Sequence, residues 1–75
     1  MKHTLCDFDK VLLSYESRKF EIVSRGWIPT PTGQVIDAGT TQRMSDCGDY
    51  EFIRIYTGLW HVDGAEYVLL RRKKV

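Results

Sequence analysis

The sequence is poor in the features that mark several classes of protein. Its 75 residues include only two cysteines, Cys6 and Cys47. Because Met1–Thr4 lacks the apolar core of a signal peptide, we expect a cytoplasmic protein whose thiols stay reduced. No apolar run reaches the roughly 18 residues of a membrane-spanning helix. We therefore expect no membrane partner.

The chain also lacks the length and the repeats of a multidomain protein. It has 75 residues, 43% of them hydrophobic, which predicts one globular domain over residues 1–75. A chain of this size buries only about 60% of its unfolded surface, so we expect a small core and modest stability. Dimerisation is a common remedy, and a homodimer is among our expectations.

Basic residues are scarce outside the last few positions. Eleven Lys and Arg stand against ten Asp and Glu, a net charge of +1, but four of the eleven are Arg71–Lys74. Without these four, seven basic residues face ten acidic ones, a balance of −3. A mildly acidic body argues against a broad nucleic-acid footprint, which needs a basic stripe over the surface. We expect residues 71–75 to be dispensable for the fold.

The most informative stretch runs from Asp49 to Arg72 and predicts three consecutive antiparallel strands. Asp63-Gly64 separates two runs rich in β-branched and aromatic residues, which is a strong hairpin signal. Thr57-Gly58 is a weaker candidate for a second two-residue turn. With both turns in place, the register of all three strands follows.

That register divides the side chains between two faces, because they alternate along a strand and align across strands. One face carries no charge and is the expected core: Ile53, Ile55, Trp60, Val62, Ala65, Tyr67 and Leu69. The opposite, mixed face carries Tyr50, Phe52, Arg54, Tyr56, Leu59, His61, Glu66, Val68 and Leu70. On it, Arg54, His61 and Glu66 align as one transverse row. A one-residue slip would exchange the faces.

The N-terminal third has two interpretations. Residues 7–25 contain no Gly or Pro, and apolar residues at helical spacing favour a helix that ends at Gly26-Trp27. The alternative is a hairpin, with alternation from Val11 to Tyr15 and from Phe20 to Ile22. Further along, the sequence predicts an extended connector over 28–33, a short strand over 34–38 and a loop over 39–49.

Together these elements predict an α+β fold. An N-terminal helix packs on a small antiparallel sheet of three to five strands, which ends in the C-terminal three-stranded meander. The alternative is an all-β small barrel of the SH3 or OB type. In that case strands near Phe20 and Val35 close the barrel and cover the mixed face with the chain's own residues.

For each candidate catalytic or metal-binding group, an ordinary structural role explains the residues better than a functional role. His3-x-x-Cys6 has ligand spacing, but Cys47 and His61 are isolated, whereas structural zinc sites come as two tight pairs. Acidic neighbours of Cys47 disfavour a reactive thiolate. His61 and Glu66 are expected cross-strand partners suited to acid–base chemistry, yet such polar pairs are common on sheets. We expect no enzyme, cofactor or metal.

The mixed face has the composition of a binding surface, since aromatic residues and Arg are enriched at interface hot spots. We therefore expect a small non-enzymatic protein that binds another protein. Its size is typical of an accessory factor or inhibitor carried by a phage or mobile element. The expected partner-binding residues are Tyr50, Phe52, Arg54, Tyr56, His61 and Glu66.

The alternative function is a small nucleic-acid-binding module. Aromatic side chains and Arg on a sheet face stack single-stranded bases in several such modules, and a basic tail adds phosphate contacts. The tail residues are then Arg71, Arg72, Lys73 and Lys74. Salt dependence separates the two functions, because phosphate binding weakens steeply with ionic strength.

Overall fold

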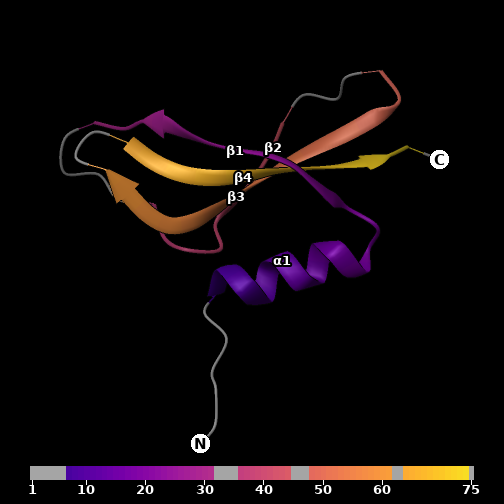
Figure 1. The fold of residues 1–75 in the computed structure, drawn as a ribbon, viewed down its shortest axis with the longest axis horizontal. Coiled ribbons are helices and arrows are strands. Elements are labelled where there is room, and N and C mark those ends of the chain that lie inside the picture. The colour runs from indigo at the N-terminus through magenta and orange to yellow at the C-terminus, as the bar shows by residue number, and fades with distance from the viewer. Residues whose placement is uncertain (1–6, 32–35, 45–47, 62–63, 75) are drawn as a thin grey trace, which may run out of the picture.

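The computed structural model describes residues 7–31, 36–44, 48–61 and 64–74, with the backbone alone for Trp60 and His61. Its elements are α1 (Asp7–Ser17), β1 (Glu21–Pro29), β2 (Thr41–Arg43), β3 (Tyr50–His61) and β4 (Gly64–Lys73). The strands form one antiparallel sheet in the order β1-β4-β3-β2, and α1 lies along one side of it (Figure 1). The expected α+β class is confirmed.

Helix α1 is amphipathic and has two acidic residues in its first turn. Asp7 and Asp9 lie in the first turn, where carboxylates interact favourably with the partial positive charge of the helix N-terminus. The side chains that pack on the core recur at helical spacing: Phe8, Val11, Leu12 and Tyr15. With 11 residues, this one described helix is not long enough to cross a membrane.

The helix ends in a Schellman motif built without glycine. Lys19 adopts φ 75°, the left-handed conformation that Gly usually supplies. Lys19 N donates to Glu16 O at 3.0 Å and Phe20 N donates to Tyr15 O at 3.1 Å, which is the hydrogen-bond pattern of the motif. The Tyr15 and Phe20 rings pack edge-to-face with centroids 5.2 Å apart. This contact turns Phe20 into the core.

The two interpretations of the N-terminal third each hold for part of it. Residues 7–17 are helical, whereas Glu21–Pro29 is a strand, as the hairpin interpretation required for its second half. The expected helix end at Gly26 is wrong, because Gly26 lies within β1. The hydroxyl of Tyr67 is 2.9 Å from where a Cβ at Gly26 would lie, so Gly26 permits a close side-chain approach.

The C-terminal three-stranded meander is present as β2, β3 and β4, but the stretch from Asp49 to Arg72 supplies only two of its strands, not three. Strand β3 continues through Thr57-Gly58 without turning. Tyr56 pairs with Tyr67 and Trp60 pairs with Ala65, so residues 57–59 lie opposite Glu66 alone. The result is a bulge, and Gly58 supplies its φ of 90°. A turn and a bulge both favour Gly at positive φ, so the local sequence does not distinguish them.

The hairpin itself forms close to the expected place, with a shifted register. His61 pairs with Gly64, not with Glu66, and Arg54 pairs with Leu69. Residues 62–63, including the expected core residue Val62, lie outside the described residues. The expected row of Arg54, His61 and Glu66 is therefore wrong.

The expected core residues of β3, Ile53 and Ile55, are confirmed. On β4 the buried residues beside them are Val68 and Leu70, which were expected on the mixed face. Ile53 lies opposite Leu70 and Ile55 lies opposite Val68, and these four side chains are buried. The expectation that Tyr67 and Leu69 belong to the core is wrong, because β4 pairs directly with residues 50–56 without the predicted intervening strand. Ala65 is buried, and its partner Trp60 has no described side chain.

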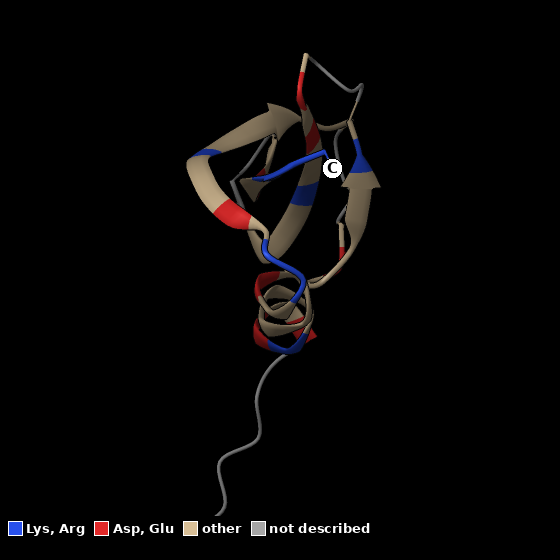
Figure 2. Ribbon diagram, turned by 90° about the vertical axis from the view of Figure 1, so that its right-hand side faces the viewer, with Lys and Arg blue, Asp and Glu red and all other residues tan. Residues whose placement is uncertain are grey.

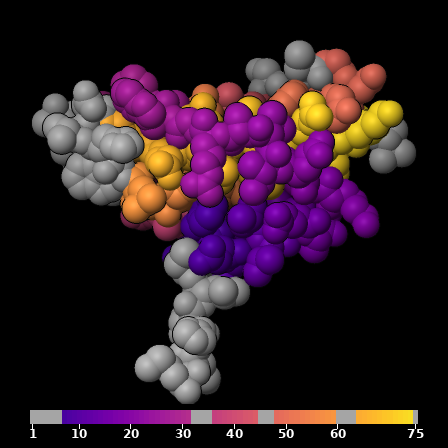
Figure 3. All heavy atoms as spheres, in the orientation of Figure 1, coloured from indigo at the N-terminus to yellow at the C-terminus, as the bar shows by residue number. Residues whose placement is uncertain are grey.

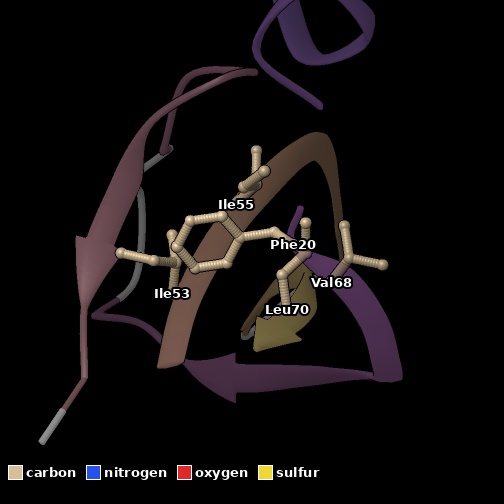
Figure 4. Packing of buried hydrophobic residues seen from close by; sticks show 5 residues of the cluster. All are labelled: Phe20, Ile53, Ile55, Val68 and Leu70. Atoms are coloured by element: carbon tan, nitrogen blue, oxygen red, sulfur yellow. The ribbon is translucent and has the colours of Figure 1, made fainter. Parts of the chain in front are cut away.

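Phe20 completes the core. Its side chain is 6% exposed and lies among the four aliphatic residues of β3 and β4 (Figure 4). The apolar side chains of α1 cover this cluster from the other side. A single layer of helix thus closes the core on one face of the sheet.

Strand β2 forms where we expected a loop. Thr41–Arg43 pairs with residues 53–55 of β3. The pairing extends one step further, since Gly39 N donates to Tyr56 O and Tyr56 N donates to Thr40 O, each at 2.8 Å. Of the strand expected over 34–38, residues 36–38 form none and the rest lie outside the described residues.

Strand β1 is an edge strand with several exposed apolar side chains. Ile22, Val23 and Trp27 are 44–51% exposed, and Figure 3 shows the side chains of β1 at the surface above those of α1. Two features blunt this edge: a register shift between Ile22 and Ser24, and the exposed charge of Arg25. Both disfavour pairing of β1 with a strand of another chain.

We predict that Gly58→Ala destabilises the protein more than Gly48→Ala. Both glycines have positive φ, 90° and 60°, so each substitution should cost about 1–2 kcal/mol of backbone strain. Only at Gly58 would the new Cβ meet a neighbour, Ala38 Cβ at 2.7 Å, whereas Gly48 has nothing within 4 Å. Urea unfolding of the two variants measures the difference. Equal losses would show that Ala38 moves aside freely.

Candidate functional site

The face of the sheet opposite α1 gathers aromatic and basic side chains. Tyr50, Phe52, Arg54 and Tyr56 alternate along β3 and share this face, as expected, because they avoid the face of Ile53 and Ile55. Their partners on β4 are Lys73, Arg71, Leu69 and Tyr67. We call the following set the aromatic face: Tyr50, Phe52, Arg54, Tyr56, Tyr67, Leu69 and Arg71. All but Tyr56 are partly exposed.

Two arginines of the aromatic face stack on tyrosines. The guanidinium of Arg71 lies 4.4 Å from the ring centroid of Tyr50, and that of Arg54 lies 4.5 Å from Tyr67. Each cation–aromatic contact at a partly exposed position is worth about 0.5–1 kcal/mol. Both guanidinium groups thus lie over tyrosine rings on this face of the sheet.

Gln42 of β2 joins Arg54 to Tyr56. Its Oε1 accepts a hydrogen bond from the Tyr56 hydroxyl at 2.9 Å and one from Arg54 Nη1 at 3.3 Å. The Tyr56 ring is 3% exposed and packs on Tyr67 with centroids 6.0 Å apart. Arg54 Nε is buried with no acceptor among the described residues. Arg54 is therefore oriented before any partner binds, and its Nε–H group still lacks an acceptor among the described residues.

Arg71 is the outer cation of the face. Its Nε donates to Glu21 Oε2 at 2.9 Å, across the β4–β1 pairing. This hydrogen bond and the charge of Glu21 raise the pKa of Arg71 above its ordinary value, against a smaller opposing effect of desolvation. Both side chains are well exposed, at 38% and 61%, so the pair is a surface ion pair with little effect on stability.

Glu66 and His61 do not join the other expected site residues. Glu66 pairs with Trp27 of β1 and accepts a hydrogen bond from Thr57 Oγ1 at 3.3 Å. Its neighbour on the helix side is Val68, so it lies on the face opposite Arg54. His61 is described only by its backbone, which pairs with Gly64. A His61–Glu66 pair aligned for acid–base chemistry is therefore wrong in this register.

The chain's own N-terminal helix does not cover the aromatic face. Helix α1 packs on the cluster of Ile53, Ile55, Val68 and Leu70, which is the other side of the sheet. The sheet has β1 and β2 at its two edges, and the described strands do not close into a barrel. Val35, expected to help close a barrel, lies outside the described residues.

The basic tail is part of the sheet, not an appendage. Strand β4 includes Arg71, Arg72 and Lys73, and Lys74 N donates to Asp49 O at 2.7 Å. Alternation sends Arg71 to the aromatic face and Arg72 to the helix side. There Arg72 lines a surface pocket of about 430 Å³ together with Arg18, Lys19 and Lys73. Sequence reasoning missed Arg18 and Lys19, which lie more than 50 positions earlier.

The metal-site candidates are not placed by the structure. Within the described ranges, no group of three or more His, Cys, Asp or Glu side chains could hold a metal ion. His3, Cys6 and Cys47 lie outside these ranges.

No family model, curated protein or solved structure matches the chain. Any functional conclusion therefore depends on the surface itself.

Proposed function

We propose that this protein is a small non-enzymatic binding protein and that the aromatic face binds another protein. The observation that carries the proposal is the pair of arginines stacked on tyrosines, Arg54 on Tyr67 and Arg71 on Tyr50. Tyr and Arg are the residue types most often found at interface hot spots. An exposed sheet face that is rich in Tyr and Arg therefore favours a role in binding.

The order of these side chains before binding favours affinity. Binding loses free energy whenever a flexible side chain is immobilised, about 0.5–1.5 kcal/mol for each one. Arg54 is already held by Gln42, Tyr56 and Tyr67. Its charge and that of Arg71 favour a partner that presents carboxylates between apolar groups.

The proposed setting is the cytoplasm, and the role is that of an accessory factor or an inhibitor, as expected for a chain of this size. A second copy of the chain is one partner to test first, since small domains often dimerise. Sedimentation velocity of the purified protein over a hundredfold range of concentration answers that question before any other partner is sought.

Replacement of Arg54 tests the proposal. Arg54→Ala should weaken partner binding by about 1–3 kcal/mol, as expected for an anchor Arg. Arg54→Lys should recover little of this loss, because an ammonium group does not reproduce the planar stack on Tyr67. The partner is first captured from nuclease-treated lysate on the immobilised full chain, and its dissociation constant is then measured by calorimetry.

The matched control is Lys10→Ala, which removes one exposed cation from α1 on the other side of the molecule. It should leave the dissociation constant unchanged. If Arg54→Ala and Lys10→Ala bind the partner equally well, the aromatic face is not the binding surface. If nuclease treatment abolishes capture, the partner is a nucleic acid and the proposal fails.

A further inference from the structure

The described residues that line the pocket between the turn after α1 and the end of β4 are all basic. Its four lining residues are Arg18, Lys19, Arg72 and Lys73, and its volume is about 430 Å³. Figure 2 shows the basic turn after α1 and the basic end of β4 on the same side of the molecule. The two segments are far apart in sequence and the fold brings their charges together.

Arg72 is held in place at this pocket. Its Nε and Nη2 donate to Glu51 Oε2 at 3.1 and 2.9 Å, and its Nη1 donates to Arg18 O at 3.1 Å. The guanidinium lies 4.6 Å from the ring centroid of Phe20. Three of its five N–H donors are thus used, which leaves two for a ligand.

The other three cations are less compensated. Arg18 stacks on Tyr15 at 4.2 Å, and Lys19 and Lys73 have no ion-pair partner among the described residues. Among the described residues, Glu51 is the carboxylate in an ion pair with a lining residue, so three of the four basic residues are not neutralised by such a pair. The carbonyl end of α1 adds only a partial negative charge, and Arg72 already donates to one of its carbonyl groups.

We propose that this pocket binds a phosphate group of its ligand. A planar guanidinium fixed by a carboxylate and flanked by flexible ammonium groups suits phosphate oxygens, which accept several charge-assisted hydrogen bonds at once. The volume lies within the range of small-ligand pockets, about 300–1,000 Å³. The phosphate comes either from a small phosphorylated molecule or from a nucleic-acid backbone. The pocket contains no member of the aromatic face as defined above, although its Lys73 pairs with Tyr50 of that face.

The left-handed conformation of Lys19 provides a variant that removes a charge without harming the fold. Gly adopts a φ of 75° more readily than Lys, so Lys19→Gly should preserve or raise stability. Lys73 is exposed and lies at the end of β4, so Lys73→Gln is also mild. The test variant combines both changes. Arg72 is left intact because it supports the fold through Glu51 and Phe20.

The experiment titrates the full chain with inorganic pyrophosphate and with a short single-stranded oligothymidine, each followed by amide NMR shifts. It is run at about 50 and 200 mM salt, because phosphate contacts weaken over this range. The wild type should bind one or both probes, with shifts centred on residues 18–20 and 72–73. The Lys19→Gly/Lys73→Gln variant should bind at least about tenfold more weakly.

The control is Lys10→Gln/Arg25→Gln, which makes the same change of net charge at exposed positions outside the pocket. It should change the affinity less than about twofold. Tighter binding of pyrophosphate assigns a small phosphorylated ligand, and tighter, steeply salt-dependent binding of the oligonucleotide assigns a nucleic-acid backbone. Equal losses in the two double variants, or no binding of either probe at millimolar concentration, would overturn the proposal.

Discussion

Phe20→Ala should lower the free energy of unfolding by about 3–5 kcal/mol, the range measured for aromatic truncations in protein cores. Phe20 is 6% exposed and fills the space between the four aliphatic side chains of the sheet and those of α1. Phe20 is the residue of the turn after α1 that belongs to the buried hydrophobic cluster. A domain of this size has little stability to spare, so the variant should be partly unfolded at 25 °C.

The same substitution removes two local contacts that surround the core. The edge-to-face contact of Phe20 with Tyr15 supports the end of α1, and its ring supports the guanidinium of Arg72. Circular dichroism during denaturant unfolding measures the total effect. Leu13→Ala is the control, because Leu13 lies on α1 and is 53% exposed. It should cost less than about 1 kcal/mol. A Phe20→Ala variant as stable as Leu13→Ala would show that the core lies elsewhere.

The importance of Phe20 could not be read from the sequence, for a physical reason. It lies between two charged residues, Lys19 and Glu21, and outside the helical period of α1. The hairpin interpretation placed it in alternation with Ile22, which is exposed in the structure. The burial of Phe20 follows from a left-handed Lys at the helix end, where sequence rules look for Gly. The alternation of β3, in contrast, was sufficient to assign Ile53 and Ile55 to the core. It also assigned four residues to the other face: Tyr50, Phe52, Arg54 and Tyr56.

The sequence predicted which residues of a single strand share a face of the sheet. It did not predict which residues of neighbouring strands lie opposite one another. Arg54 and its β3 neighbours share a face by alternation alone. Glu66 was placed wrongly because a glycine at positive φ fits a turn and a bulge equally well, and the choice at Gly58 decides which residues of β4 face Arg54. The pairing of β1 with β4, which brings Glu21 to Arg71, has no local signal in the sequence.

Removal of Arg71–Val75 should unfold the protein or nearly so, contrary to our expectation from the sequence. That expectation treated the segment as a charged tail, whereas Arg71, Arg72 and Lys73 are the last residues of β4. β4 is a central strand, so its end pairs on both sides, with Glu21 of β1 and with residues 50–52 of β3. Deletion therefore strips backbone partners from two strands at once.

The deletion also opens the core. Arg72 covers the ring of Phe20 and pairs with Glu51, whose side chain is 18% exposed, so its loss would leave a poorly solvated carboxylate without a partner. Because the pair is partly exposed, leaving Glu51 unpaired costs about 1–3 kcal/mol. Together with the lost pairing, this is comparable with the total stability expected of a small domain, about 5 kcal/mol.

A charge-only control separates the backbone from the side chains. Lys73→Gln/Lys74→Gln removes two of the basic charges but keeps the strand and the hydrogen bond from the amide of residue 74 to Asp49 O. Its denaturant midpoint should stay close to that of the wild type, while the 71–75 deletion should lose its cooperative transition. Amide hydrogen exchange of residues 50–52 gives the local readout, because these residues pair with the deleted segment. If the deletion variant keeps the wild-type midpoint and the protection of these amides, the end of β4 contributes nothing to the fold and the pairing described here is wrong.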